Sequence, residues 1–108
     1  MFNSLRLFLL VEFRVDNARL SGAIPSELAR CTALKSFSVG NNRMTGTLPV
    51  DLEELEELEE LNIWSTGISG TFPSGICDHG YGKVVTTHIE FPGCTCCTVL
   101  DNNGEMVP

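Results

Sequence analysis

Basic residues are scarce in this chain, which has seven Lys and Arg residues against fourteen Asp and Glu residues and a formal net charge of −7. Proteins that bind nucleic acid or anionic membrane surfaces attract these partners with clustered positive charge. The composition therefore argues against both kinds of partner, and no nucleic acid is expected to bind.

Long apolar runs are also missing. The run at 7–11 is short and Glu12 ends it, and no segment approaches the roughly 20 apolar residues that cross a bilayer. The N-terminus does not resemble a secretory signal, because no small-residue cleavage site follows the run. We expect the chain to be a fragment of a longer protein, with an uncapped first strand, and to meet a membrane only through other parts of that protein.

Recognised catalytic arrangements are absent as well. Neither His79 nor His88 has a serine or cysteine nearby in a known nucleophile context. The glycine-rich segment 80–83 lacks the spacing of a phosphate-binding loop. We therefore expect no catalytic residue, no cofactor and no enzymatic activity.

What the chain does contain is a repeated phrase. Three copies of [Ser/Thr]-Gly-x-apolar-Pro begin at Ser21, Thr45 and Ser69, so they lie 24 residues apart. A period of roughly 20 to 29 residues is typical of a solenoid with one strand and one turn per repeat. Apolar residues recur at fixed offsets from the phrase, and stacked copies would bury them as ladders. The aligned sets are Leu20, Met44 and Ile68; Leu28, Leu52 and Ile76; Phe13, Phe37 and Leu61; Val15, Val39 and Ile63; Leu10, Leu34 and Leu58; and Leu7, Cys31 and Leu55.

Each repeat is expected to supply one short strand, at the apolar-x-apolar triplets 13–15, 37–39 and 61–63. The segment 84–89 is expected to supply one last strand that covers the open end of the core. Proline fixes φ and is rejected from central strands, so the proline that ends each phrase is expected to open the convex side of the solenoid.

The acidic, leucine-rich run 51–61 could be mistaken for a coiled coil or a long helix. Its leucines recur every third residue, which on an α-helix drifts about 60° per step. This spacing favours a short 3₁₀ turn that leads into a strand, with Leu52, Leu55, Leu58 and Leu61 buried. Its carboxylates are expected on a solvated convex face, the alternative being a docking site for a basic partner.

The pattern Leu34-x-x-Phe37-x-Val39-x-x-Asn42-x-Met44-Thr45-Gly46-Thr47-Leu48-Pro49 resembles the plant-specific type of leucine-rich repeat, over roughly residues 4 to 80. Such repeats occur in plant receptor kinases, receptor-like proteins and polygalacturonase inhibitors, and in algae such as diatoms. The resemblance implies an α/β-type, right-handed repeat solenoid, with short parallel strands on the concave face and a 3₁₀ or irregular convex side. Asn42 matches the family's turn-ladder asparagine, but its equivalents Ala18 and Thr66 depart from it.

The same resemblance implies recognition rather than catalysis. It predicts a module of an extracellular or cell-surface receptor-like protein whose concave sheet binds a protein, a peptide or a glycan. The alternative is a structural capping fragment with no binding site of its own. The repeats are expected over residues 1–84 (a partial first copy, then 13–36, 37–60 and 61–84), and a cysteine-containing cap and tail over 85–108.

Outward positions of the expected strands define the candidate binding surface. This surface comprises Arg14, Asp16, Ser38, Asn62 and Trp64. Glu12, Ser36 and Glu60 border it, and Thr86 and His88 extend it. As the single tryptophan, Trp64 is a plausible anchor for a ligand. The alternative is that Trp64 only shields the sheet near the cap.

Four cysteines follow the last copy of the phrase, at Cys77, Cys94, Cys96 and Cys97. Cysteine-stapled caps are usual in extracellular members of the family, so disulfides are expected. Cys96 and Cys97 are adjacent and cannot easily pair, so Cys77 is expected to join one of the other three, although connectivity cannot be read from sequence. The alternatives are free thiols or a zinc site completed by His79 or His88. No bound metal is expected.

Cys31 stands apart from these four cysteines. It occupies a leucine column of the repeat, so we expect it to be a buried free thiol.

Overall fold

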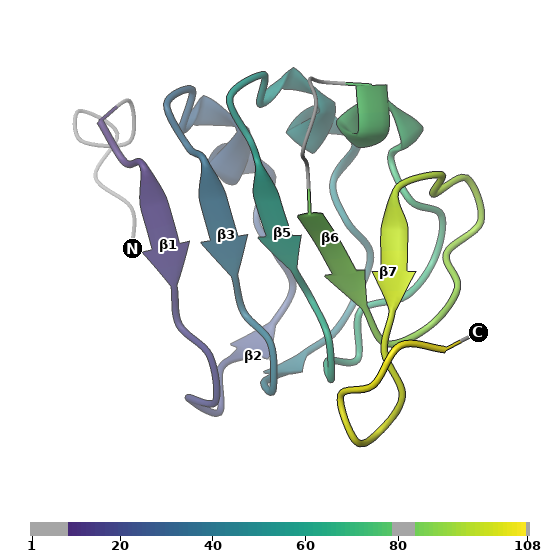
Figure 1. The fold of residues 1–108 in the computed structure, drawn as a ribbon. Helices are drawn as coiled ribbons and strands as arrows, with labels where there is room; N and C mark the ends of the chain where they lie inside the picture. Colours follow the sequence, from purple (N-terminus) through teal and green to yellow (C-terminus); the bar gives the residue numbers. More distant parts are fainter. Residues whose placement is uncertain (1–8, 79–83, 108) are drawn as a thin grey trace.

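A computed structural model describes residues 9–78 and 84–107 and shows short strands and short 3₁₀ helices (Figure 1). Leu7, His79 and the segment 80–83 lie outside the described residues. The strands are β1 (Glu12–Arg14), β2 (Ser21–Gly22), β3 (Ser36–Ser38), β4 (Arg43–Met44), β5 (Glu60–Asn62), β6 (Val84–Thr87) and β7 (Cys97–Val99). The 3₁₀ helices are η1 (Ser26–Arg30), η2 (Val50–Glu54) and η3 (Ser74–Asp78).

The main sheet is parallel throughout, with the strand order β1-β3-β5-β6-β7 (Figure 1). Its register follows the 24-residue period, since Phe13 pairs with Phe37, Phe37 with Leu61 and Leu61 with Val85. The predicted solenoid of parallel strands is confirmed. Each strand begins one residue before its apolar triplet. The last triplet residue still joins the ladder, as when Val39 N donates to the Asn62 carbonyl at 3.0 Å.

The repeated phrase and the residues just before it form a second, smaller ladder on another side of the coil. β2 and β4 pair in parallel, and an isolated bridge joins Thr47 to Ser69. The glycines of the three phrases have φ angles of +86°, +82° and +89°, in the left-handed region that favours glycine. This backbone requirement explains why the phrase keeps its glycine.

The convex side begins at the prolines, as expected. η1, η2 and η3 each start at the residue after the proline of a phrase. In the acidic run, η2 ends before Leu55, a further turn follows, and the chain then enters β5. A coiled coil over 51–61 is thereby ruled out, and its four leucines are all 1–2% exposed.

Stacked apolar ladders fill the space between the sheet and the convex turns. The most deeply buried side chains include Leu28, Leu34, Ile63, Phe72 and Ile76. Cys31 is fully buried among them and free, as expected, and burial raises the pKa of its thiol. No helix in the described ranges is long and apolar enough to cross a membrane.

Beyond the last repeat, the chain adds one strand more than we expected. The strand anticipated within 84–89 is β6. β7 extends the sheet by pairing in parallel with β6, and Val85 lies opposite Cys97. The connection between these two strands is about half a repeat, which is why the 24-residue spacing gave no signal for β7.

Candidate functional site

The outward positions of the sheet bring the predicted binding residues onto one face. Arg14, Ser38 and Asn62 lie in register on β1, β3 and β5, and Thr86 on β6 continues their row. Asp16 and Trp64 follow the ends of β1 and β5. The structure therefore brings together the five residues from separate repeats, although their environments differ.

An ion pair crosses the start of this face. The Arg14 Nη2 atom lies 2.5 Å from Glu60 Oε1 and donates a hydrogen bond to Ser36 Oγ at 3.2 Å. The side chains of Arg14 and Glu60 are 47% and 33% exposed. A partly exposed pair of this kind adds little stability. Its main consequence is that Arg14 is held over β3, with half of its side chain open to solvent.

A hydrogen-bond network connects the other polar residues of the face. Asp16 Oδ1 accepts from the Ser38 hydroxyl at 2.7 Å and from the Gly40 amide at 2.8 Å. The Asn62 amide nitrogen donates to Ser38 Oγ at 3.1 Å, and its oxygen accepts from the Trp64 amide at 3.0 Å. Ser38 is only 2% exposed. It therefore orients Asp16 and Asn62 from below and does not itself face a partner.

Gly40 forms the floor between these side chains, a role that the sequence pattern did not reveal. A Cβ atom at this position would lie 2.9 Å from Asn62 Nδ2 and 3.3 Å from Asp16 Oδ1. Any larger residue would push the network apart. The close approach of Asp16 and Asn62 therefore depends on Gly40.

Trp64 lies against the C-terminal tail. Its indole N–H donates to the Asp101 carbonyl at 3.1 Å, and Gly104 packs beside its six-membered ring. The Asp101 carboxylate holds the tail turn by accepting from the amides of Asn103 and Glu105. The indole N–H is thus already used, which favours the shielding interpretation for this edge of the ring. No sequence signal pointed to the tail.

Thr86 and His88, which extend the predicted surface, differ in their contacts. Thr86 is half-buried in the row of Asn62. His88 is held by the Ile63 carbonyl, 3.1 Å from its Nδ1 atom, and packs edge-on against Phe91. His88 is therefore a structural residue of the cap.

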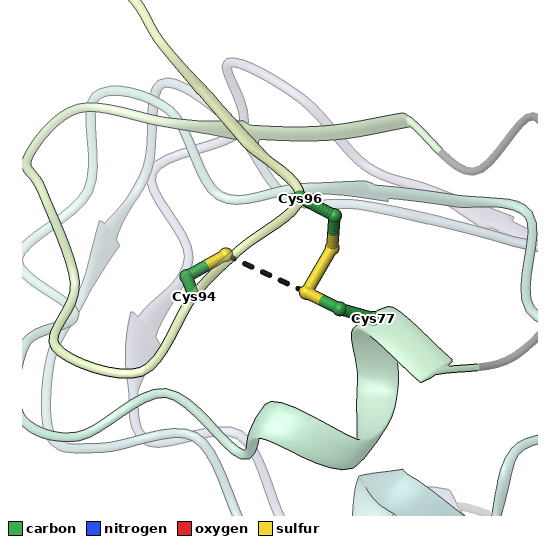
Figure 2. Close-up of side chains that lie close together, drawn as sticks. All are labelled: Cys77, Cys94 and Cys96. Atoms are coloured by element: carbon green, nitrogen blue, oxygen red, sulfur yellow. Dashed lines mark hydrogen bonds between the residues drawn. A yellow bond between two sulfur atoms is a disulfide. The ribbon is translucent and has the colours of Figure 1, made fainter.

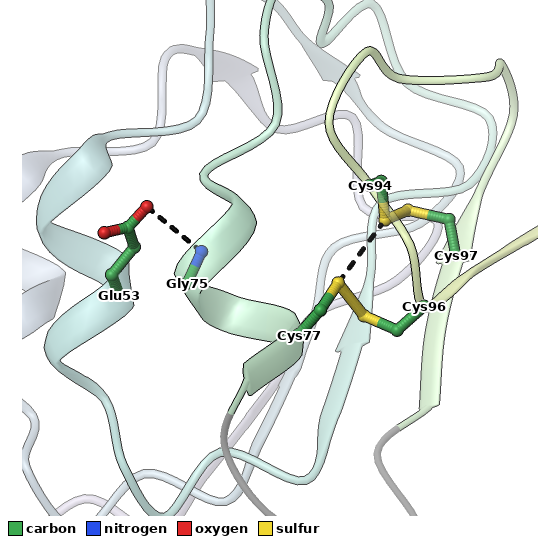
Figure 3. Close-up of a disulfide and its surroundings, with 6 residues drawn as sticks. All are labelled: Glu53, Gly75, Cys77, Cys94, Cys96 and Cys97. Atoms are coloured by element: carbon green, nitrogen blue, oxygen red, sulfur yellow. Dashed lines mark hydrogen bonds between the residues drawn. A yellow bond between two sulfur atoms is a disulfide. The ribbon is translucent and has the colours of Figure 1, made fainter.

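Two disulfides staple the cap, so the prediction of disulfides is confirmed (Figures 2 and 3). Cys77 joins Cys96 across 19 residues, in agreement with the expected pairing of Cys77 with a later cysteine, and Cys94 joins Cys97 across 3. Loop-closure entropy gives the long loop about 3 kcal/mol and the short one about 2 kcal/mol. A disulfide sulfur is not a thiolate ligand, so the zinc interpretation lacks its donors in this state.

The acidic run serves several purposes. Its carboxylates at Asp51, Glu54, Glu56, Glu57 and Glu59 are exposed, as a solvated face requires. Glu53 instead accepts a hydrogen bond from the Gly75 amide at 3.2 Å and joins η2 to η3 (Figure 3). Glu60 lies on β5 and belongs to the concave face.

Between η1 and η2 lies a polar hollow of about 240 Å³. Its lining residues are Ser26, Glu27, Ala29, Arg30, Asp51 and Glu54.

Comparison with known proteins supports the repeat assignment. A family model described as Leucine Rich Repeat matches residues 57–79. No curated protein matches the chain.

Several solved structures resemble the fold. One is the leucine-rich-repeat ectodomain of the Arabidopsis thaliana membrane receptor kinase GASSHO1/SCHENGEN3, in complex with CASPARIAN STRIP INTEGRITY FACTOR 2. Its sequence is 26% identical to that of our chain, and the TM-score is 0.62. The match covers 68% of our chain and 9% of that one. The plant peptide hormone receptor RGFR1 in complex with RGF2 is 25% identical, with a TM-score of 0.66 and coverages of 77% and 13%.

The BIR3–SERK2 complex of Arabidopsis thaliana is similar in fold, at 24% identity and a TM-score of 0.63, with coverages of 89% and 49%. The chain thus spans about a tenth of the length of the two receptors and half of the third protein. The repeated phrase, the parallel sheet and these matches agree on a leucine-rich repeat fold that is similar to the fold of plant receptor ectodomains.

Proposed function

We propose that this chain is a recognition module that binds an extended segment of a protein or peptide on its concave sheet. We name the binding surface the concave patch and define it as Arg14, Asp16, Asn62 and Trp64. Two similar plant receptors are in complexes, one with CASPARIAN STRIP INTEGRITY FACTOR 2 and the other with RGF2. These complexes carry the proposal, because they combine the same fold with bound partners.

The hydrogen-bond network supports this choice of surface. Asp16 is exposed, yet its carboxylate is fixed by Ser38 and Gly40. A fixed polar group loses little conformational entropy when a partner binds, which favours affinity. Asp16 suits a donor such as a lysine, an arginine or a peptide N–H, and Arg14 suits a carboxylate.

Ser38 was predicted to contact the ligand, but in this proposal it positions Asp16 and Asn62. Its hydroxyl donates to Asp16 and accepts from Asn62 while it stays buried. Trp64 contributes the part of its ring that the tail leaves open. Binding by surface complementarity makes and breaks no covalent bond, so the proposed activity is not enzymatic. We place the module in an extracellular or cell-surface protein, where its disulfides would persist.

A displayed library of random peptides tests the proposal without a known ligand. Peptides enriched on the folded protein should bind more weakly, by about tenfold or more, to Asp16→Ala or Arg14→Ala. The matched control is Glu57→Ala on the convex side, which should bind them as tightly as the unmodified protein does. The concave site would be overturned if Glu57→Ala lost binding while Asp16→Ala kept it. It would also be overturned if no peptide in the library were enriched on the folded protein.

The bond from Trp64 to Asp101 favours a second candidate function, that of a structural cap. In that case the tail fills the place of a ligand, and recognition belongs to other repeats of a longer protein. A Trp64→Ala variant that folds normally and binds the selected peptides with full affinity would support a capping role for Trp64. A weakened affinity would support its place in the concave patch.

A further inference from the structure

We propose that the two cap disulfides form a thiol–disulfide exchange site that an external dithiol activates by reducing Cys94–Cys97. The released Cys94 then attacks the Cys77–Cys96 bond. The inference is independent of any ligand on the concave sheet, because it depends only on the four cap cysteines.

The main observation is a contact between the two disulfides. The Cys94 sulfur lies 3.8 Å from the Cys77 sulfur, which belongs to the other bridge (dashed line, Figure 2). The sulfurs of Cys77, Cys94 and Cys96 all lie within 4.8 Å of one another. Exchange requires one sulfur to reach another directly, and Cys94 already meets this condition.

The two bridges also differ in how firmly the fold holds them. Cys94–Cys97 closes a loop of only three residue steps, whereas Cys77–Cys96 joins η3 to the bend before β7 across 19 (Figure 3). A short loop restricts the unfolded chain less than a long one does. All four cysteines are half-buried rather than sealed in the core, so a small reductant can reach them. Cys94–Cys97 is therefore the first bond to be reduced.

The exchange is balanced in atoms and electrons. The external dithiol gives two electrons and two protons to Cys94–Cys97 and becomes a cyclic disulfide. The Cys94 thiolate then attacks the Cys77 sulfur, the Cys77–Cys96 bond breaks, and Cys96 leaves as a thiolate that takes up the proton lost by Cys94. The product has a Cys77–Cys94 disulfide and thiols at Cys96 and Cys97.

Attack needs one local movement. With all three sulfurs within 4.8 Å, Cys94 lies beside the Cys77–Cys96 bond and not along its axis. Once Cys94 is released from Cys97, its side chain can rotate to approach along that axis. The transfer moves the anchor of η3 from the start of β7 to the preceding turn. It therefore loosens β7, the edge strand of the sheet.

A matched pair of variants tests this route. Both Cys97→Ser and Cys94→Ser lose the short disulfide, so both carry the same loss of stability. In Cys97→Ser the free Cys94 lies beside Cys77, and disulfide mapping by mass spectrometry should find a Cys77–Cys94 fraction that forms faster at about pH 8.5 than at about pH 7, because more of the thiol is ionised. In Cys94→Ser the free Cys97 should leave Cys77–Cys96 intact.

Equal rearrangement in the two variants, or none in either, would overturn the proposal. In the unmodified protein, limited reduction with dithiothreitol followed by alkylation should label Cys96 and Cys97 and leave a Cys77–Cys94 bond. Label on Cys94 and Cys97 with Cys77–Cys96 retained would mean that no transfer occurs. Label on Cys77 and Cys96 would mean that the long bridge is reduced first, and either result contradicts the route.

Discussion

Asn42 connects two repeats with a single side chain. Its amide nitrogen donates to the carbonyls of Val15, Val39 and Gly40, and its oxygen accepts from the amides of Ala18 and Leu20. Among the described residues, Thr66, its equivalent in the next repeat, bonds to the Ile63 carbonyl and the Ile68 amide, which are near it in the chain. The middle turn is therefore the more firmly joined one.

Replacing Asn42 by Ala should lower the free energy of unfolding by about 2–4 kcal/mol, because several backbone groups lose their partners in a poorly solvated place. Thr66→Val is the control of similar shape, and it should cost about 1 kcal/mol. Urea denaturation followed by circular dichroism measures both. Equal losses in the two variants would refute a special role for Asn42.

Cys31 provides a second prediction at the residue scale. Burial raises the pKa of its thiol above the ordinary value. The folded-state pKa is thus above the unfolded one, so this contribution to stability is complete below the unfolded pKa and is lost as pH rises through the folded pKa. In the native oxidised protein, Ellman's reagent should find no reactive thiol at about pH 8, and one per chain after denaturation. A fast native reaction would contradict the burial of Cys31.

At the scale of elements, the glycines of the repeated phrase offer a matched comparison. Gly22 and Gly70 both have positive φ angles, but a Cβ atom at Gly22 would meet nothing within 4 Å, whereas one at Gly70 would lie 2.6 Å from Thr47 Cγ2. Gly22→Ala should cost about 1–2 kcal/mol of stability from backbone strain alone. Gly70→Ala should cost about 1–3 kcal/mol more, from the clash.

Adding Thr47→Ser to Gly70→Ala removes the methyl group and should recover most of the clash term but none of the strain term. Thermal or urea unfolding of these variants, with Thr47→Ser alone as a reference, separates the two terms. No difference between Gly22→Ala and Gly70→Ala would contradict the close packing of neighbouring phrases.

The acidic run gives another test at this scale. Leu58 is 2% exposed and Glu57 is exposed, although they are neighbours in the chain. Leu58→Ala should destabilise the protein by about 2–5 kcal/mol, whereas Glu57→Ala should change stability by less than about 0.5 kcal/mol. Similar effects in the two denaturation curves would mean that the run does not have the repeat register described above.

The elements that sequence could predict are those that the period repeats. The strands at Phe13, Phe37 and Leu61, the turns after the prolines and the buried leucines of 51–61 all follow from copies in register. β7 and the tail turn at Asp101 could not be predicted, because each occurs once and has no counterpart in an earlier repeat. The site was predictable to the same extent, since the period gives the outward direction of Asp16 and Trp64 but not what their atoms bond to.

At the scale of the whole molecule, the sheet ends in a cap that reaches back to Trp64 on the concave face. The tail turn bonds to Trp64, and the Cys77–Cys96 disulfide ties the start of β7 to η3. Removing residues 100–108 should expose the indole, so tryptophan emission should shift to longer wavelength and acrylamide should quench it more strongly. Unchanged emission and quenching would show that the tail does not cover Trp64 in solution.

The concave patch is the central claim, and chemical-shift mapping tests it most directly. Amide signals of the isotope-labelled protein are followed while a peptide selected from the random library is added. Binding on the sheet predicts shifts at Arg14, Asp16, Gly40 and Asn62 and little change in η1 and η2. Shifts confined to η1, η2 and the acidic run, with the strand signals unmoved, would contradict it.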